Sequence, residues 1–197
     1  MKKILGLVLL FAVTHCLEYL YKGEMEKLKK DNLIGVLSKL ETSFAVSFTL
    51  KLNNFSDGFR SVLHLTTGEN NEKYGDRIPG VWIYYKMLHV AFAINGNQNH
   101  YLFSKPLTLG EWTVFQIRQS VASGKTIFEV YVNFEKVYEV ENLKPQEFKN
   151  VKVYAGDPWY EAQDGYIGNI VVFPLHAQTK NSLKNDAIKK KKFGPEF

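Results

Sequence analysis

The sequence predicts an all-β protein, an antiparallel two-sheet β-sandwich of the jelly-roll type. Between residues 43 and 175, apolar and polar side chains alternate in nine or so short runs. Period-two alternation places every second side chain on the same side of a strand, so that one face is buried and the other stays wet. Turn-forming residues separate the runs, and none of the runs has the length and period of a long helix.

The expected strands follow one another closely along the chain. In the clearest run, 43–53, the side chains of Phe44, Val46, Phe48 and Leu50 fall on one face and mostly polar side chains on the other. The remaining strands are expected at 33–40, 60–67, 79–85, 87–95, 99–104, 112–121, 125–133, 136–141, 149–155 and 165–173.

Two tight hairpins connect strands in this prediction. Asn95 and Gly96 form the dipeptide that primed turns favour, because both residues tolerate positive φ. Ser123 and Gly124 separate two further alternating runs in the same way. We therefore expect antiparallel pairing across both turns.

The chain begins like a secreted protein. Two lysines precede an apolar run from Ile4 to Val13, and Thr14 and Cys16 are small enough for a cleavage site. We expect a signal peptide at 1–16 and a secreted, extracellular protein, since the run is shorter than the about 20 residues of a membrane span. Cys16 is the single cysteine, so the mature chain would have no disulfide and no thiolate site.

Three further segments are expected after the signal peptide. Residues 17–32 read as a short helix or an irregular lead-in, 33–176 as the sandwich domain, and 177–197 as a flexible basic tail. Residues 180–197 contain six lysines and two acidic residues, so much of the net charge of +5 lies outside the folded body. A nearly neutral body argues against a nucleic-acid-binding surface.

Three stretches carry a resemblance to a known superfamily: SVLHLTTGENNEKYGDRIPGVWIYY, LGEWTVFQIRQ and NVKVYAGDPWYEAQDGYIGNIVVFPL. The Gly-x-Ile-x-Asn ending, formed by Gly165, Ile167 and Asn169, and the Gly-Glu-Trp strand start at Trp112 are its recurrent marks. Over about 33–175 the chain resembles a laminin G-like, concanavalin A-like lectin jelly roll. Its Gly-Asp-Arg-Ile-Pro and Asp-Pro-Trp-Tyr stretches are similar to those of single-domain secreted proteins from cnidarians and other marine invertebrates.

The resemblance implies two antiparallel sheets, one of them concave, with ligand-binding loops on one rim. Members of the superfamily bind glycans, extracellular proteins or lipids, often through calcium. A fold alone does not fix a function. The individual residues therefore have to be weighed one by one.

Calcium is the candidate cofactor. Hard divalent cations take carboxylate and carbonyl oxygens held in loops, and Asp76 and Asp157 are the candidate metal ligands. No two carboxylates lie close in the sequence, as they would in Asp-x-Asp, and aspartate beside glycine or proline is also an ordinary turn residue. Arg77, directly after Asp76, is a candidate partner in an ion pair as well as a candidate ligand-binding residue.

Aromatic side chains provide the other candidate ligand-binding residues. Trp159 and Tyr160 are expected on a loop, where flat rings can stack against the apolar faces of sugars. Trp82 lies on an expected strand and is a candidate for the same role, but it faces the same way as Tyr84, and core packing is the favoured explanation for it. Trp112 opens a strand and is expected to be structural.

The histidines and carboxylates give little sign of catalysis. The spacings of His64, His89, His100 and His176 match no metal motif, and each is expected to be a structural histidine with its hydrogen bonds satisfied. Glu139 and Glu141 share a face but are expected on a wet strand edge. We find no nucleophile elbow and no phosphate loop. The sequence thus predicts no catalytic residues and a protein that is not an enzyme.

Asn54 begins the sequon Asn-Phe-Ser in a turn, which makes it a candidate glycosylation site in a secreted chain. The leading functional prediction is a secreted recognition module that binds a glycan or an extracellular matrix protein through rim loops, with calcium as a candidate aid. Two alternatives stay open: a carrier of an apolar small molecule such as a lipid or a carotenoid-like pigment, and a structural protein that self-associates through sheet edges.

Overall fold

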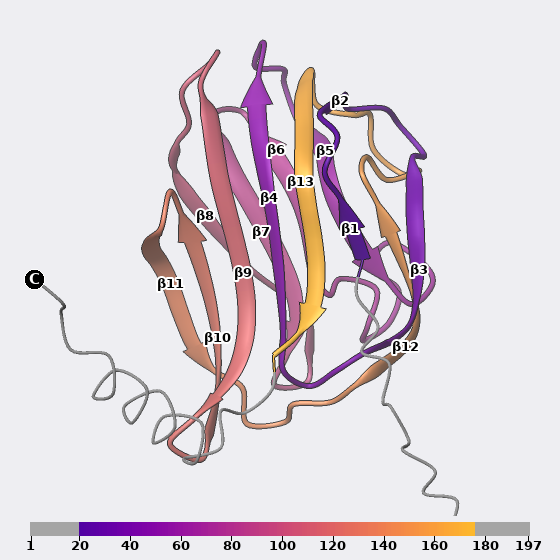
Figure 1. Ribbon diagram of the computed structural model, residues 1–197, viewed down its shortest axis with the longest axis vertical. Coiled ribbons are helices and arrows are strands. Elements are labelled where there is room, and N and C mark those ends of the chain that lie inside the picture. The colour runs from indigo at the N-terminus through magenta and orange to yellow at the C-terminus, as the bar shows by residue number, and fades with distance from the viewer. Residues whose placement is uncertain (1–19, 176–197) are drawn as a thin grey trace, which may run out of the picture.

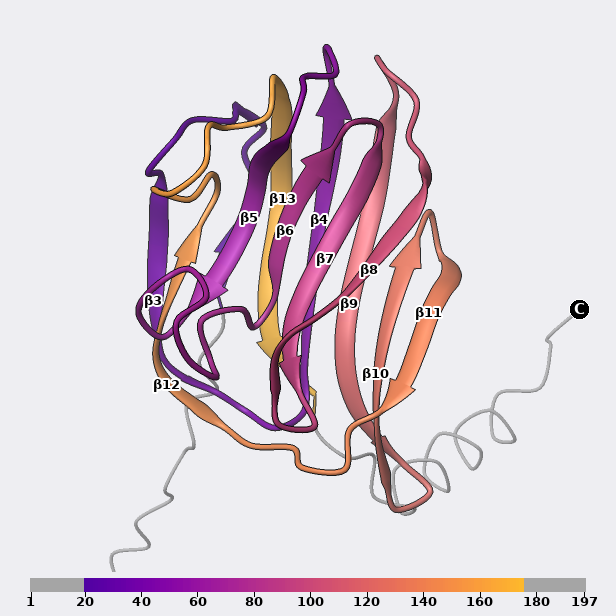
Figure 2. The same cartoon turned by 180° about the vertical axis from the view of Figure 1, so that it is seen from behind.

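The computed structural model describes residues 20–175, and it shows a β-sandwich built of two antiparallel sheets (Figures 1 and 2). The predicted signal peptide, the whole predicted basic tail and His176 lie outside the described residues. The strands are β1 (Leu20–Lys22), β2 (Glu26–Lys27), β3 (Leu33–Leu40), β4 (Phe44–Leu52), β5 (Phe59–Thr66), β6 (Gly80–Tyr84), β7 (Met87–Ile94), β8 (Asn97–Pro106), β9 (Trp112–Ala122), β10 (Lys125–Val132), β11 (Glu135–Glu141), β12 (Phe148–Tyr154) and β13 (Gly165–Pro174).

The two sheets differ in the strands that they bring together. The seven-stranded sheet, nearer the viewer in Figure 1, has the order β1-β13-β4-β9-β10-β11, with β2 also paired to β13. The six-stranded sheet, nearer the viewer in Figure 2, has the order β3-β12-β5-β6-β7-β8. Within residues 20–175 no helix is long and apolar enough to cross a membrane. The two antiparallel sheets confirm the predicted all-β fold class.

The core lies between the sheets and follows the predicted alternation. Every strand expected from residue 33 onward is present, with bounds within two residues of the prediction. Phe48 on β4 is fully buried and stacks on Phe115 of β9 at a centroid distance of 5.1 Å. The two predicted hairpins are also confirmed, because the residues at 95–96 and 123–124 all have positive φ.

The segment before residue 33 differs from the predicted short helix or irregular lead-in. Its described part forms the short strands β1 and β2, which add to the edge of β13, with Leu20 opposite Val172 and Lys27 opposite Tyr166. Leu28 is buried in the core directly afterwards. An unpaired strand edge offers free backbone donors and acceptors, and these captured a segment whose charged sequence gave no strand pattern of its own.

A bulge in β5 changes which side chains face outward. Ser61 pairs with Trp82 and Leu63 pairs with Val81, so the register shifts between residues 61 and 63. After the bulge Leu63 points into the core, and His64 faces the outer side of the sheet. This arrangement agrees with the prediction that His64 opposes the core leucines.

Candidate functional site

The outer face of the six-stranded sheet carries the largest cluster of aromatic side chains in the described part of the chain. Cross-strand register sets Ser61 opposite Trp82, Trp82 opposite His89 and His89 opposite Phe103, in one row across β5 to β8. Because the core takes the neighbouring residues of each strand, this row points away from the other sheet.

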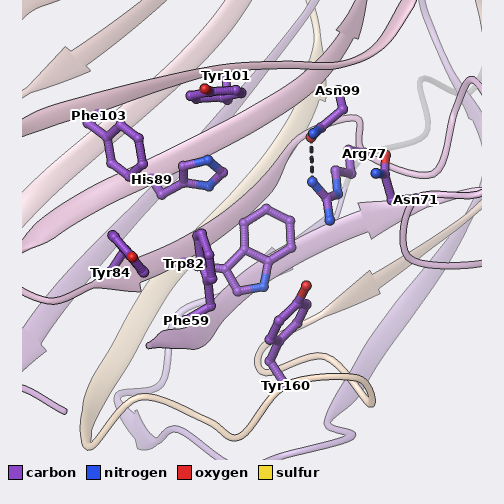
Figure 3. A pocket seen from close by; sticks show the side chains of 10 residues that line it. All are labelled: Phe59, Asn71, Arg77, Trp82, Tyr84, His89, Asn99, Tyr101, Phe103 and Tyr160. Carbon is purple, nitrogen blue, oxygen red and sulfur yellow. Dashed lines mark hydrogen bonds between the residues drawn. The ribbon is translucent and has the colours of Figure 1, made fainter. Parts of the chain in front are cut away.

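A pocket of about 370 Å³ opens above this row (Figure 3). Such a volume lies within the usual range for small-molecule sites. Four strands, the loop between β5 and β6 and the loop between β12 and β13 supply its lining. The lining residues are Phe59, Asn71, Arg77, Trp82, Tyr84, His89, Asn99, Tyr101, Phe103 and Tyr160.

Trp82 forms the centre of the pocket and is held on several sides. Its indole lies over Gly80, where an added Cβ would come 2.1 Å from the ring. Its Nε1 donates to the Asp157 carboxylate at 3.0 Å, and the Arg77 guanidinium stacks 4.8 Å from the ring centroid. The ring is only 1% exposed, so it offers a rigid base with little free area.

Aromatic side chains wall one end of the pocket (Figure 3). Phe59 stacks on Tyr84 at 4.4 Å between centroids, and Phe103 lies 4.7 Å from His89. Tyr101 and Phe103 are 55% and 41% exposed and face the opening. This end can bury the apolar face of a ring-shaped ligand while the Tyr hydroxyls reach its polar groups.

Polar side chains gather at the other end (Figure 3). Arg77 is 7% exposed, and its Nε and Nη2 donate to the backbone and side-chain oxygens of Asn70 at 3.0 and 3.1 Å. Its Nη1 donates to the side-chain oxygen of Asn99. The Tyr160 hydroxyl lies at the same end and accepts from the Asn70 amide at 3.4 Å.

Two polar atoms of the pocket have no hydrogen-bond partner among residues 20–175. They are Nδ1 of His89 and Oδ1 of Asn71, and both are fully shielded from solvent. His89 as a whole is 5% exposed, and burial together with the nearby charge of Arg77 lowers its pKa from 6.5 to about 4. The imidazole is therefore neutral at pH 7. The prediction of a fully satisfied structural histidine is wrong for His89.

The other two described histidines do have partners. The ring nitrogens of His64 meet the Asp157 carboxylate at 3.1 Å and the backbone oxygen of Asp76 at 2.7 Å. His100 meets the Tyr138 hydroxyl at 2.6 Å. The prediction of satisfied structural histidines is confirmed for these two.

The structure brings three of the four predicted ligand-binding residues together. Trp82, Arg77 and Tyr160 line the pocket, although they come from a strand and two different loops. Trp159 lies apart from it, with its ring 5.2 Å from His64 and 6.2 Å from Tyr154. Trp159 and Tyr160 are neighbours on one loop, but successive side chains of the turn point in different directions. Only the Tyr160 ring therefore lines the pocket.

The carboxylate of Asp157 ties its own loop to the sheet. Oδ1 accepts backbone N–H groups of Trp159 and Tyr160 at 3.1 and 2.8 Å, and Oδ2 accepts from Trp82 and contacts His64. Burial raises its pKa, but the His64 contact and the hydrogen bonds from Tyr160 and Ser61 outweigh burial, so the pKa lies below its ordinary value.

Asp76 has a similar internal role. Its Oδ2 accepts the backbone N–H groups of Glu72 and Lys73 at 2.7 and 2.8 Å, and its Oδ1 that of Glu69 at 3.3 Å. A calcium ion needs several oxygens that are free to converge. The carboxylates of Asp76 and Asp157 do not fit that role, and no group of three acidic, histidine or cysteine side chains with metal-site geometry occurs in residues 20–175.

The remaining candidates lie away from the pocket. Asn54 is exposed in the connection between β4 and β5, and its side-chain oxygen accepts the Phe55 N–H at 2.9 Å. Glu139 pairs with Lys136, and Glu141 pairs with Lys125 at 2.9 Å. These two carboxylates therefore form ion pairs on the edge strand β11 and face no common cleft.

Most residues of the pocket wall were not predicted from the sequence. Asn99, Tyr101 and Phe103 alternate along β8, so the period-two pattern could have placed them on one outer face. Asn71 carried no comparable pattern, because it lies in a loop whose position depends on Arg77. The pairing of distant strands, which sets these rings beside Trp82, cannot be read from any single segment.

No protein-family model and no curated protein matches the sequence. Among solved structures, two of the receptor-binding domain of botulinum neurotoxin type G are similar, with 10% and 9% identity and TM-scores of 0.50 and 0.53. The matches cover 88% and 90% of this chain, and the chain spans about half the length of those proteins, 46% and 48%. Sheep galectin-11 in complex with glycerol matches at 15% identity and a TM-score of 0.41, over 78% of this chain and 99% of that one.

At these identities the likeness shows the fold alone. The narrower likeness to secreted marine-invertebrate proteins stays a prediction. The chain has the jelly-roll β-sandwich fold of the botulinum receptor-binding domains, with an aromatic pocket on the outer face of its six-stranded sheet.

Proposed function

We propose that the protein is a secreted, non-enzymatic recognition module that binds a glycan in the pocket around Trp82. Binding takes place on the sheet face and at the two loops that flank it. This differs from the rim-loop arrangement expected from the sequence, because Asp76, Asp157 and Trp159 are engaged in internal contacts.

One observation carries the proposal: His89 and Asn71 line one pocket, and the buried Nδ1 of His89 and Oδ1 of Asn71 have no partner among the described residues. Most buried polar atoms in folded proteins are hydrogen-bonded, and leaving one unsatisfied costs about 1–3 kcal/mol. A ligand that supplies both donors and acceptors would remove that cost. Sugar hydroxyls do both, so they suit an amide oxygen and an imidazole nitrogen.

The aromatic end of the pocket fits the same class of ligand. The C–H faces of sugar rings stack on aromatic side chains, and exposed Tyr101 and Phe103 present such surfaces beside the opening. The receptor-binding domains with the same fold support a recognition role as a general expectation. The proposed residue roles, however, rest on the pocket.

The space between the sheets is less suited to the alternative carrier role. Beside Phe92 and Phe128, a cavity that reaches both sheets has a volume of only about 10 Å³. That is roughly the volume at which a single water fits. The outer pocket, at about 370 Å³, offers more room for an apolar ligand. Self-association through sheet edges stays a prediction.

A glycan array followed by calorimetric titration of the strongest hit tests the proposal. His89→Phe keeps a ring of similar size among its aromatic neighbours and removes Nδ1, and Asn71→Ala removes Oδ1. We expect each change to weaken binding about tenfold, the loss of one hydrogen bond to a buried group. The matched control is His100→Phe, since His100 has its partner in Tyr138 and lies outside the pocket.

The outcomes separate clearly. An array without a single binder, or a hit whose affinity is unchanged in both pocket variants, contradicts the proposed function. Equal losses in His100→Phe and His89→Phe would assign the effect to general destabilisation and would also count against it. Binding should not change when calcium is chelated, because the carboxylates at 76 and 157 are already engaged.

A further inference from the structure

The buried Arg77 guanidinium has no acidic partner in the described part of the chain. Within residues 20–175, no carboxylate oxygen lies within 4.0 Å of it, and its partners are neutral groups: amide oxygens of Asn70 and Asn99 and the Tyr160 hydroxyl. Burial lowers its pKa, while Tyr160, Asp157 and Asp76 act in the opposite direction from nearby. Burying a cation without a paired anion is costly, so such a group calls for a specific explanation.

The nearest acidic groups are already engaged elsewhere. The Asp157 oxygens receive donors from Trp82, Trp159 and Tyr160, and the Asp76 oxygens receive the backbone of their own loop. Neither carboxylate can turn toward the guanidinium without breaking several of these bonds. The ion pair that the sequence suggested between Asp76 and Arg77 is therefore not formed.

Arg118 is a second arginine of this chain that stacks on an aromatic ring. It stacks 4.6 Å from the ring centroid of Tyr131, much as Arg77 stacks on Trp82, but its Nε also donates to Glu129 at 2.6 Å. Both guanidinium groups stack on an aromatic ring, but among the described residues only Arg118 also has a carboxylate partner. At Arg118 the protein supplies the carboxylate, and at Arg77 the corresponding place opens into the pocket.

We propose that the pocket takes an acidic sugar, whose carboxylate or sulfate group is bound by Arg77 while its ring lies against the aromatic end. The two terminal nitrogens of Arg77 carry four N–H groups, and their partners in the described structure are Asn99, Asn70 and the Tyr160 hydroxyl, so donor capacity remains for an acidic acceptor. The Tyr160 hydroxyl at this end can donate to the same group. This inference rests on the proposed function and names the ligand class for that site.

Matched sugars test the inference on the unaltered chain. Methyl glucuronide and methyl glucoside differ only in a carboxylate against a hydroxymethyl group, and galactose 6-sulfate and galactose differ only in the sulfate. Calorimetric titration should give about tenfold tighter binding for the acidic member of at least one pair. The pair that shows the difference distinguishes a carboxylate from a sulfate ligand. The difference should shrink at about 0.5 M NaCl, where charges are screened.

Variants locate the charge. Arg77→Gln should abolish the preference for the acidic sugar, and Arg77→Lys should keep part of it, since the charge stays but the planar fork is lost. Arg118→Gln, in the opposite sheet, is the matched control and should keep the full preference. Because Arg77 also anchors the loop through Asn70, thermal unfolding of each variant has to accompany the titration. The comparison of acidic and neutral sugars on the wild-type protein does not depend on the stability of any variant.

The results distinguish the two levels of the proposal. Equal binding of the acidic and neutral members, with losses in His89→Phe, would overturn the acidic-sugar inference and leave glycan binding intact. Failure of all four sugars and of the array would overturn both. An acidic preference that survives in Arg77→Gln would assign the charge recognition to another group and overturn the role given to Arg77.

Discussion

Trp82 separates two regions that use the same residue types in opposite ways. On one side His64, Asp157 and the backbone of the 157–160 turn form a closed network in which both carboxylate oxygens have donors. On the other side, the buried atoms of His89 and Asn71 remain without partners. Burial of a polar side chain therefore does not mark a binding site, whereas unused hydrogen-bonding capacity beside an open pocket does.

The largest expected effect comes from a substitution in the closed network around Asp157, which we call the closed side; the region around His89 and Asn71 is the open side. Asp157→Ala would leave the Trp82 indole N–H and two backbone N–H groups without their acceptor in a buried region. Removing one member of a buried charged network costs about 3–5 kcal/mol of unfolding free energy. Urea unfolding followed by tryptophan fluorescence measures this. Asp57→Ala, at an exposed aspartate, is the control and should lie within about 0.5 kcal/mol of wild type.

A loss below about 1 kcal/mol in Asp157→Ala would show that the network is dispensable. The decrease of the unfolding free energy at acidic pH gives a second check. Because the pKa of Asp157 is lowered in the folded protein, its carboxylate stabilises the fold at pH values above the ordinary aspartate pKa of 3.8. That stabilisation is lost as the pH falls further, through the folded-state pKa.

The next effect belongs to the open side and has a different pH window. The pKa of His89 is about 4 in the folded protein against 6.5 in the unfolded chain, so the unfolded state binds more protons between these values. The contribution of the neutral His89 side chain to the free energy of unfolding is fully present above pH 6.5. It falls by up to about 3 kcal/mol as the pH decreases to 4. In His89→Phe this slope should flatten. Urea midpoints at several pH values between 4 and 7 measure it, and His100→Phe should keep the wild-type slope.

If His89→Phe and wild type show the same slope across that window, the buried neutral imidazole is not the cause. A ligand that fills the pocket with an acidic group should also change the slope, because a nearby anion favours the charged imidazole. The slope measured with and without such a ligand thus reports on the open side alone.

The closed and the open side were not equally predictable from the sequence. The strands, their alternation and the turns at 95–96 and 123–124 follow local patterns, and local patterns predicted them well. The aspartates at 76 and 157 were recognised as loop residues, yet a turn aspartate and a metal-binding aspartate look alike until their donors are known. The bulge at 61–63 and the pairing of β1 with β13 depend on neighbours that are distant in the sequence.

The candidate site shows the same division. Trp82, Arg77 and Tyr160 attracted attention as residue types suited to ligands, and the structure places all three in one pocket. The partnerless state of His89 could not be foreseen, since it arises because no donor or acceptor on β6, β8 or the flanking loops reaches Nδ1. An unmet hydrogen bond is a property of the assembled fold and leaves no trace in local composition.

A smaller effect is expected at Gly80, which lies under the Trp82 ring that both regions share. In Gly80→Ala the added Cβ would meet the Trp82 ring, so the indole has to shift away from both Asp157 and the pocket. Overpacking of this kind costs about 1–3 kcal/mol. Thermal unfolding measures the loss, and titration with a sugar ligand should show weaker binding. Gly96→Ala is the control: its Cβ meets nothing within 4 Å, so only the strain of positive φ remains and binding is unchanged.

The smallest effect on stability comes from the outermost ring of the open side, and it gives the sharpest contrast with Asp157. Tyr101 is 55% exposed, so Tyr101→Ala removes little buried surface and should lower the unfolding free energy by only about 0.5 kcal/mol. Its ring faces the pocket opening, so the same change should weaken sugar binding about tenfold, through the lost stacking contact. Denaturation and titration of one preparation measure both values. A variant that loses several kcal/mol of stability, or that binds as tightly as wild type, would show that the outer ring supports the fold, as Asp157 does, and does not bind the ligand.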